Sequence, residues 1–153
     1  MADDNDKVVR ALHDLVATCN DGAEGYAKAA KGVHDTELVN WLVRISDERE
    51  RFAADLTSAI RDLGGEPRTD LHLGGILHSG WVDLEQRVRP KDEREILQEC
   101  IAGDTGTLKH YDHALAQELR PGTRSLVEQQ RAAVERDLNS VQSRANRQKS
   151  QHA

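Results

Sequence analysis

Aromatic residues are scarce in this chain, and long apolar runs are missing. Only 3% of the 153 residues are Phe, Trp or Tyr, whereas 31% are charged. A β-sandwich needs β-branched and aromatic residues on its inner faces, so this composition favours amphipathic helices with Ala, Leu and Val interiors. We therefore expect an all-α fold. Because no apolar stretch approaches the roughly 18 residues that a bilayer crossing requires, we expect no membrane partner.

Basic charge is not in excess either. Lys and Arg number 21 against 27 Asp and Glu, which gives a formal net charge of −6. Such a chain has no overall field that attracts it to phosphate backbones, so nucleic acid is not an expected partner. The first residues, Met-Ala-Asp-Asp-Asn-Asp, are acidic where a secretory signal is basic and then apolar. We expect a cytoplasmic protein.

Cysteine is rare, but the two cysteines that are present open the same pattern, CxxGxxG. The two copies are Cys19, Gly22, Gly25 and Cys100, Gly103, Gly106. Small residues at this spacing share one broad helix face, and glycine costs a helix interior roughly 1 kcal/mol relative to alanine. We therefore expect two related halves whose first helices cross closely at these residues. Both thiols are expected to be packing residues, and a disulfide between the two halves stays an alternative.

Apolar residues recur at alternating steps of three and four through four long stretches, which predicts four helices. The stretches cover about residues 6–31, 36–63, 92–119 and 123–143. Gly32, the run Gly64-Gly65-Glu66-Pro67 and the pair Pro121-Gly122 separate them as helix terminators. We expect one domain over residues 1–143 and a basic, frayed tail over residues 144–153.

The connections between these helices differ in length, and this difference predicts the topology. The first and last links are short, whereas the middle one, Glu66 to Pro90, is long, rich in glycine and expected to be partly helical. Short links make antiparallel hairpins, and a long crossover makes the second and third helices parallel. Two helical hairpins joined in this way form a ferritin-like four-helix bundle.

Four separated motifs carry a family resemblance. They are Asp21–Tyr26, Leu63–Pro67, Leu77–Leu84, and Gly103-Asp104 followed by Leu108–Tyr111 and Ala114-Leu115. In this order they resemble a bacterial ferritin-like family of four-helix-bundle proteins known only as a domain of unknown function. The resemblance implies the fold but no reaction. The chain departs from the family pattern in its last helix, with Arg131 in place of an aromatic residue after Gln130 and Leu138 in place of a histidine.

A bundle of this kind raises the hypothesis of a di-iron or di-manganese centre. That chemistry requires a Glu from each of two helices and a Glu-x-x-His pair from each of the other two. The histidines are missing: the residues three positions after Glu48, Glu50, Glu128 and Glu135 are Arg51, Ala53, Arg131 and Leu138. We therefore expect no resident cofactor and no enzyme activity, with iron or manganese as the alternative.

Two carboxylates nonetheless fall on apolar stripes. Glu48 lies between Ile45 and Phe52, and Asp104 lies in the same way between Ile101 and Leu108. A buried carboxylate raises its pKa or finds a partner. The candidate partners are Arg44, Arg49, Lys109, Gln130, Tyr26, Tyr111 or a metal ion. One interpretation is that both carboxylates lie at the edge of the stripe and meet arginine or water. The other is an altered metal site made of Glu24, Glu48, Asp104 and either Gln130 or Glu128.

The crossover contains a second pair of interest. His78 and Trp81 share one helix face and are expected to anchor the crossover to the bundle. Three functions remain open at this point. The preferred one is a non-enzymatic module that acts through its surface, as a homo-oligomer with a dimer favoured, in stress physiology. The alternatives are a metal-binding bundle with a carboxylate site and a carrier of a small apolar ligand.

Overall fold

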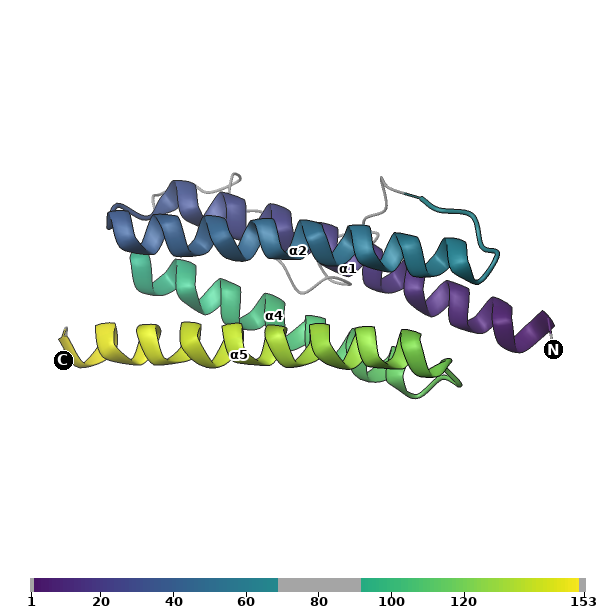
Figure 1. The fold of residues 1–153 in the computed structure, drawn as a ribbon. Coiled ribbons are helices and arrows are strands. Elements are labelled where there is room, and N and C mark those ends of the chain that lie inside the picture. Colours follow the sequence, from purple (N-terminus) through teal and green to yellow (C-terminus); the bar gives the residue numbers. More distant parts are fainter. Residues whose placement is uncertain (1, 69–91, 152–153) are drawn as a thin grey trace.

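The computed structural model describes residues 2–68 and 92–151 and shows a bundle of long helices. The helices in this part of the chain are α1 (Ala2–Gly32), α2 (Thr36–Asp62), α4 (Glu93–Leu115) and α5 (Pro121–Gln151). No strand occurs among the described residues. As Figure 1 shows, α1 and α2 form one antiparallel hairpin, and α4 and α5 form the other. Helices α2 and α4 both begin at the end of the bundle where the C-terminus lies, so the predicted parallel arrangement is confirmed.

The helix ends follow local signals in the sequence. Asp92 precedes α4, and its carboxylate accepts a hydrogen bond from the Glu95 backbone N–H at 2.8 Å. Helix α2 ends at Asp62, and Gly64 shortly after it adopts a φ of 81° that side-chain-bearing residues rarely tolerate. The next N–H, of Gly65, donates to the Ile60 carbonyl at 2.9 Å and completes the cap. The predicted glycine terminator is thus confirmed.

The last helix is longer than the sequence predicts. We expected the chain to fray from Arg144 onward, but α5 continues as a helix to Gln151. Ala145 is buried in the core, and Arg144 donates to the Asp35 carboxylate at 2.6 Å. Asp35 directly precedes α2, so this ion pair ties the last part of α5 to the other hairpin.

The core consists of two apolar clusters that follow each other along the bundle. One contains buried side chains of all four helices, including Leu12, Leu15, Leu56, Tyr111 and Val127. The other includes Tyr26, Leu42, Ile45, Leu97 and Val141. Burial of each large apolar side chain contributes roughly 1.5–3 kcal/mol relative to exposure. The space between the two clusters is occupied by polar side chains, and this layer is the candidate site.

None of the helices that the structure describes combines the length and the apolar character required to cross a bilayer.

Candidate functional site: a buried arginine at the centre of the bundle

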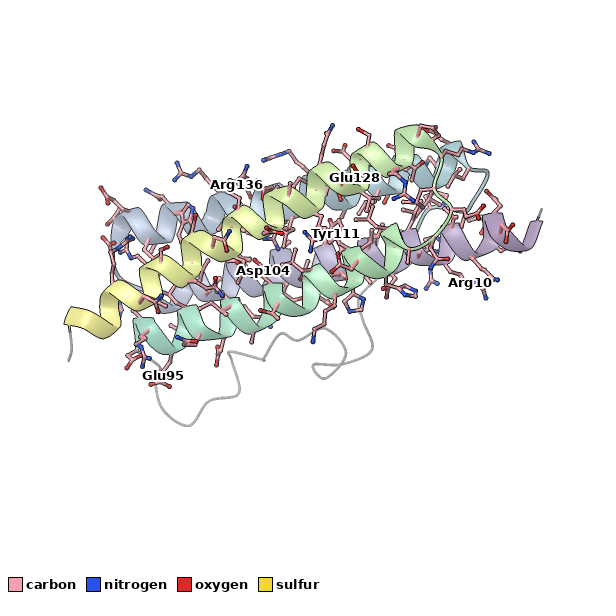
Figure 2. All side chains as sticks on the ribbon, turned by 90° about the horizontal axis from the view of Figure 1, so that it is seen from below. Arg10, Glu95, Asp104, Tyr111, Glu128 and Arg136 are labelled. Carbon is pink, nitrogen blue, oxygen red and sulfur yellow. The ribbon has the colours of Figure 1, made fainter. Side chains whose placement is uncertain are left out.

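Each helix contributes one position to the polar layer between the two clusters. These positions are Gly22 on α1, Arg49 on α2, Asp104 on α4 and Asp137 on α5. Arg49 and Asp104 have no exposed surface, and Asp137 is nearly buried. Figure 2 shows Asp104 pointing into the space between the helices. A charged layer in the interior of a bundle requires internal compensation, because water is excluded.

Arg49 supplies the positive charge of this layer. Its Nη1 donates to Asp104 Oδ1 at 2.7 Å, and its Nη2 donates to Asp104 Oδ2 at 2.9 Å. Nη2 also donates to Asp137 Oδ2 at 3.3 Å. The bond to Asp104 is bidentate, which is the strongest geometry for a guanidinium and a carboxylate. One cation therefore satisfies carboxylates from both helices of the second hairpin.

Tyr26 and Gly22 of α1 complete the surroundings of the guanidinium. The Tyr26 hydroxyl donates to Asp104 Oδ2 at 2.5 Å, and the Arg49 guanidinium carbon lies 5.2 Å from the centre of the Tyr26 ring. A Cβ atom at position 22 would lie 3.3 Å from Arg49 Nη1. Glycine at this position thus leaves room for the arginine side chain.

The pKa values of this layer follow from its burial and its charges. Burial is the largest single influence and lowers the pKa of the Arg49 guanidinium, but the charge of Asp104, its hydrogen bonds to Arg49 and the charge of Asp137 act together against burial. The net pKa lies well above the ordinary value. Burial and the negative charge of Asp104 raise the pKa of Tyr26 well above its usual range. Arg49 therefore stays a cation and Tyr26 stays a neutral hydrogen-bond donor.

Glu48 lies at the edge of the layer and not in its centre. Its side chain is 19% exposed, and its Oε2 accepts a hydrogen bond from Arg136 at 3.1 Å. Burial, together with a hydrogen bond and the negative charge of Asp137, raises the pKa of Glu48 to about 7. Oε1 of Glu48 is 3.9 Å from Arg49 Nε, too far for a hydrogen bond. Glu48 thus lies at the edge of the stripe and meets an arginine, as the first of the two interpretations from the sequence has it, whereas the fully buried position of α2 is that of Arg49.

A second polar group lies inside the first apolar cluster. Tyr111 donates its hydroxyl hydrogen to Gln130 Oε1 at 2.7 Å, and the hydroxyl oxygen of Tyr111 lies 3.2 Å from Cys19 Sγ. Gln130 Nε2 donates to the Phe52 carbonyl at 3.3 Å. Burial raises the pKa of Cys19 to about 11, and burial also raises the pKa of Cys100. Both cysteines are free, so these thiols are packing residues as expected.

The four candidate metal ligands do not converge. Glu24 is exposed and pairs with Lys28 at 3.1 Å. Gln130 is bound to Tyr111 and Phe52, and the charge of Asp104 is neutralised by Arg49. The described residues contain no group of three His, Cys, Asp or Glu side chains that could hold a metal ion. The residues present here therefore do not fit a carboxylate-bridged metal pair, since the inner carboxylates are occupied by a guanidinium.

The structure places the CxxGxxG residues only in part at a contact of α1 with α4. Cys19 faces Tyr111 of α4, as the predicted crossing requires. Gly22 instead faces Arg49 of α2. For Gly25, Gly103 and Gly106 the close crossing stays a prediction, and Cys100 is buried in the second cluster. His78 and Trp81 lie outside the described residues.

Two residues of the layer had little or no signal in the sequence. Arg49 was one of several candidate partners for the inward carboxylates, and Asp137 was not singled out. Both occupy the correct helical phase: Arg49 is four residues from Ile45 and from Ala53, and Asp137 is three residues after Val134. The signal that could have revealed them is a charged residue at an apolar-stripe position in three of the helices, Arg on one and Asp on the other two.

The whole bundle is similar to solved structures of ferritin-like proteins. An X-ray structure of the Desulfovibrio desulfuricans bacterioferritin that concerns its diiron site matches with a TM-score of 0.80 at 20% identity, over 97% of this chain and 83% of that one. A ferritin-like diiron-carboxylate protein of Bacillus anthracis matches with a TM-score of 0.73 at 19% identity, over 95% and 99%. At this identity the likeness shows the fold alone, which is that of a ferritin-like four-helix bundle.

The sequence itself places the chain in a family. The model of the Domain of unknown function (DUF2383) matches residues 7–117, so the chain belongs to this family. The match covers α1, α2 and α4 and ends before α5. The sequence matches no curated protein.

Proposed function

We propose that this protein is a non-enzymatic ferritin-like bundle that acts through its surface, as a homo-oligomeric interaction module. The observation that supports this most is the bidentate ion pair between Arg49 and Asp104, with both side chains fully buried. A di-iron centre needs its interior carboxylates free to bind two metal ions. Here the corresponding negative charge is neutralised by a guanidinium that belongs to the chain.

Metal analysis of protein purified without a histidine tag tests the first half of the proposal. After incubation with ferrous iron or manganese and removal of excess metal, we expect far less than one ion per chain by plasma mass spectrometry. We also expect no acceleration of ferrous oxidation over buffer. One or more tightly held ions per chain in the wild type, lost in Asp104→Asn, would overturn the proposal.

A second candidate function, a metal-binding bundle with an altered carboxylate site, has one observation in its favour. Glu48 and Asp137 form a carboxyl pair that borders a surface hollow, with Arg136 on its rim. Two carboxylates are few ligands for Mn²⁺ or Fe²⁺, which take mostly six. Weak metal binding that is lost in Glu48→Gln but kept in Asp104→Asn would support this candidate over the first.

The oligomeric half of the proposal needs its own measurement. Light scattering coupled to size-exclusion chromatography gives the molar mass in solution without assumptions on shape. We expect about twice the 17.1 kDa of the chain. A mass of one chain over the whole accessible concentration range contradicts self-association and leaves an interaction with another protein as the remaining form of this proposal.

A further inference from the structure

The two hairpins meet unevenly, and this leaves a hollow on one side of the bundle. Helices α2 and α5 touch each other far less than α1 touches α2 or α4 touches α5. Near the start of α2 and the end of α5 the gap forms a hollow of about 510 Å³. Sites for small molecules typically measure roughly 300–1,000 Å³. We call this space the arginine hollow, after the side chains that line it.

Positive charge dominates the arginine hollow, although the chain as a whole is acidic. Arg44 of α2 and Arg144 and Arg147 of α5 line it, against Glu37 as the acidic lining residue. Arg144 is held in place by Asp35 at 2.6 Å. Arg44 and Arg147 form no ion pair within the described part of the chain. Two guanidinium groups without an ion pair in that part of the chain thus line the same hollow as the single carboxylate of Glu37.

Guanidinium groups select a particular chemistry. Their planar arrangement of N–H donors matches the oxygen atoms of carboxylates and phosphates. Ser140 and Asn40 also line the hollow and add neutral hydrogen-bonding groups. An anion with two or three oxygen atoms can therefore accept hydrogen bonds here from two arginines and from these neutral groups.

Trp41 gives the arginine hollow an apolar wall. The indole packs against the second core cluster on one side and lines the hollow on the other, so its position is fixed by the core. An indole held in this way offers a flat surface for stacking. A flat apolar group attached to the anion would therefore gain contact here.

We propose that the arginine hollow is a binding site for a small organic anion, a carboxylate or a phosphate that carries an aromatic ring. The anion contacts Arg44 and Arg147, and the ring lies against Trp41. This site is separate from the Arg49 layer, and its ligand is charged, unlike the apolar ligand considered from the sequence. The inference stands or falls independently of the proposed absence of a metal centre.

Phenyl phosphate is a suitable probe, because it carries both features. Binding is followed by the shift of the Trp41 indole N–H signal in two-dimensional NMR, assigned with Trp41→Phe, during titration of the full chain. We expect saturable binding that weakens by about tenfold or more in Arg44→Gln and in Arg147→Gln, as the loss of a charge-assisted hydrogen bond implies. Arg61→Gln, an exposed arginine of α2 outside the hollow, is the matched control and leaves the affinity unchanged.

Two further probes separate the parts of the ligand. Benzyl alcohol has the ring without the charge, and inorganic phosphate has the charge without the ring, so both are expected to bind at least tenfold more weakly than phenyl phosphate. Equal affinity of benzyl alcohol would overturn the role of the arginines. Equal affinity of inorganic phosphate would overturn the role of Trp41. The inference fails altogether if phenyl phosphate does not saturate, or if Arg44→Gln and Arg147→Gln bind it as the wild type does while their circular dichroism shows folded protein.

Discussion

Arg49 illustrates what a buried charge demands of its neighbours. The transfer of a guanidinium and a carboxylate out of water costs several kcal/mol for each ion, and only close, well-aligned partners offset this. Asp104, Asp137 and Tyr26 provide these partners from three different helices. An apolar layer would stabilise the bundle at least as well, so the ion pair is better understood as fixing which helices meet and in which register.

Replacement of Arg49 by Met tests this dependence. The substitution keeps much of the volume but leaves the Asp104 carboxylate buried without a cation, and Asp137 keeps only Arg136, at 3.6 Å. We expect the free energy of unfolding, measured in urea, to fall by about 3–5 kcal/mol. Arg136→Ala is the control, since Arg136 is largely exposed and its ion pairs are worth under about 1 kcal/mol.

The double variant Arg49→Met/Asp104→Leu separates the loss of a partner from the loss of volume. It removes both charges of the central pair, so we expect it to be more stable than Arg49→Met alone. If Arg49→Met costs no more than Arg136→Ala, the ion pair does not hold the layer together.

Glu48 predicts a pH dependence of stability. Its pKa is raised from 4.5 to about 7 in the folded protein, by burial first and by Asp137 second. The folded state therefore binds this proton more tightly than the unfolded state. Stability is highest at low pH with respect to this group, and it falls as pH rises from about 4.5 through about 7, where Glu48 ionises beside Asp137.

Glu48→Gln removes this titration while keeping the shape of the side chain. We expect the free energy of unfolding of the wild type to decrease between pH 5 and pH 8, and this slope to become smaller in the variant. Arg136 and Arg49 face the same carboxyl and stay charged throughout, so they do not add to the slope. Equal slopes in the two proteins would show that Glu48 has an ordinary pKa.

At the scale of the helices, the spacing of apolar residues and the glycine and proline terminators were enough to predict most helix positions and buried faces. The stripe residues Leu56, Val127, Val134 and Val141 are buried, and Gly64 follows the end of α2 as expected. The end of α5 was missed, because the polar composition after Arg144 hides the buried Ala145 and the ion pair with Asp35. Such contacts between distant segments leave no local pattern.

The site was predicted only in part, for a similar reason. Asp104 stands out because the apolar stripe of α4 passes through it without ambiguity. On α2, steps of three and of four from Ile45 reach Glu48 and Arg49 respectively, and both steps occur in helices. Only the partner on the other hairpin decides between them. The burial of Arg49 depends on Asp104 and on the absence of a side chain at Gly22, which are remote in sequence.

The role of Gly22 can be tested against the alternative that it serves a crossing of α1 with α4. Gly22→Leu places a side chain where the Arg49 guanidinium lies, so we expect a loss of about 3 kcal/mol or more in urea denaturation, from overpacking and from displacement of the ion pair. Gly122→Ala is the control, because a Cβ atom there meets nothing within 4 Å.

A double-mutant cycle of Gly22→Leu and Arg49→Met decides between these two roles of Gly22. If Gly22 makes room for Arg49, Gly22→Leu costs much less in an Arg49→Met background than in the wild type, because the shorter and more flexible Met can move aside. Additive effects of the two substitutions would instead assign Gly22 to the contact with α4. Tyr26, one turn further along α1, is kept unchanged in all four proteins.

At the scale of the whole molecule, the contact between α2 and α5 is the weakest of the contacts between neighbouring helices, and we call it the weak seam. Helices α1 and α2 pack through apolar side chains of both clusters. Helices α2 and α5 touch each other far less, and polar links join them: Arg49 with Asp137, Arg136 with Glu48, and Gln130 with the Phe52 carbonyl. The arginine hollow lies along this same seam. Polar links of this kind add less net stability than buried apolar contact.

Hydrogen exchange can locate this seam. Amides exchange through local and sub-global openings whose free energies reflect the contacts that must break. We expect the amides of α5 between Val127 and Val141 to be less protected than those of α1 between Leu12 and Tyr26, although both stretches are helical and line the core. Arg49→Met should lower protection in α5 further while affecting α1 less, because the substitution removes the link across the weak seam. Uniform protection of the two stretches would mean that the four helices open only together and that the polar layer couples the hairpins as firmly as the apolar clusters do.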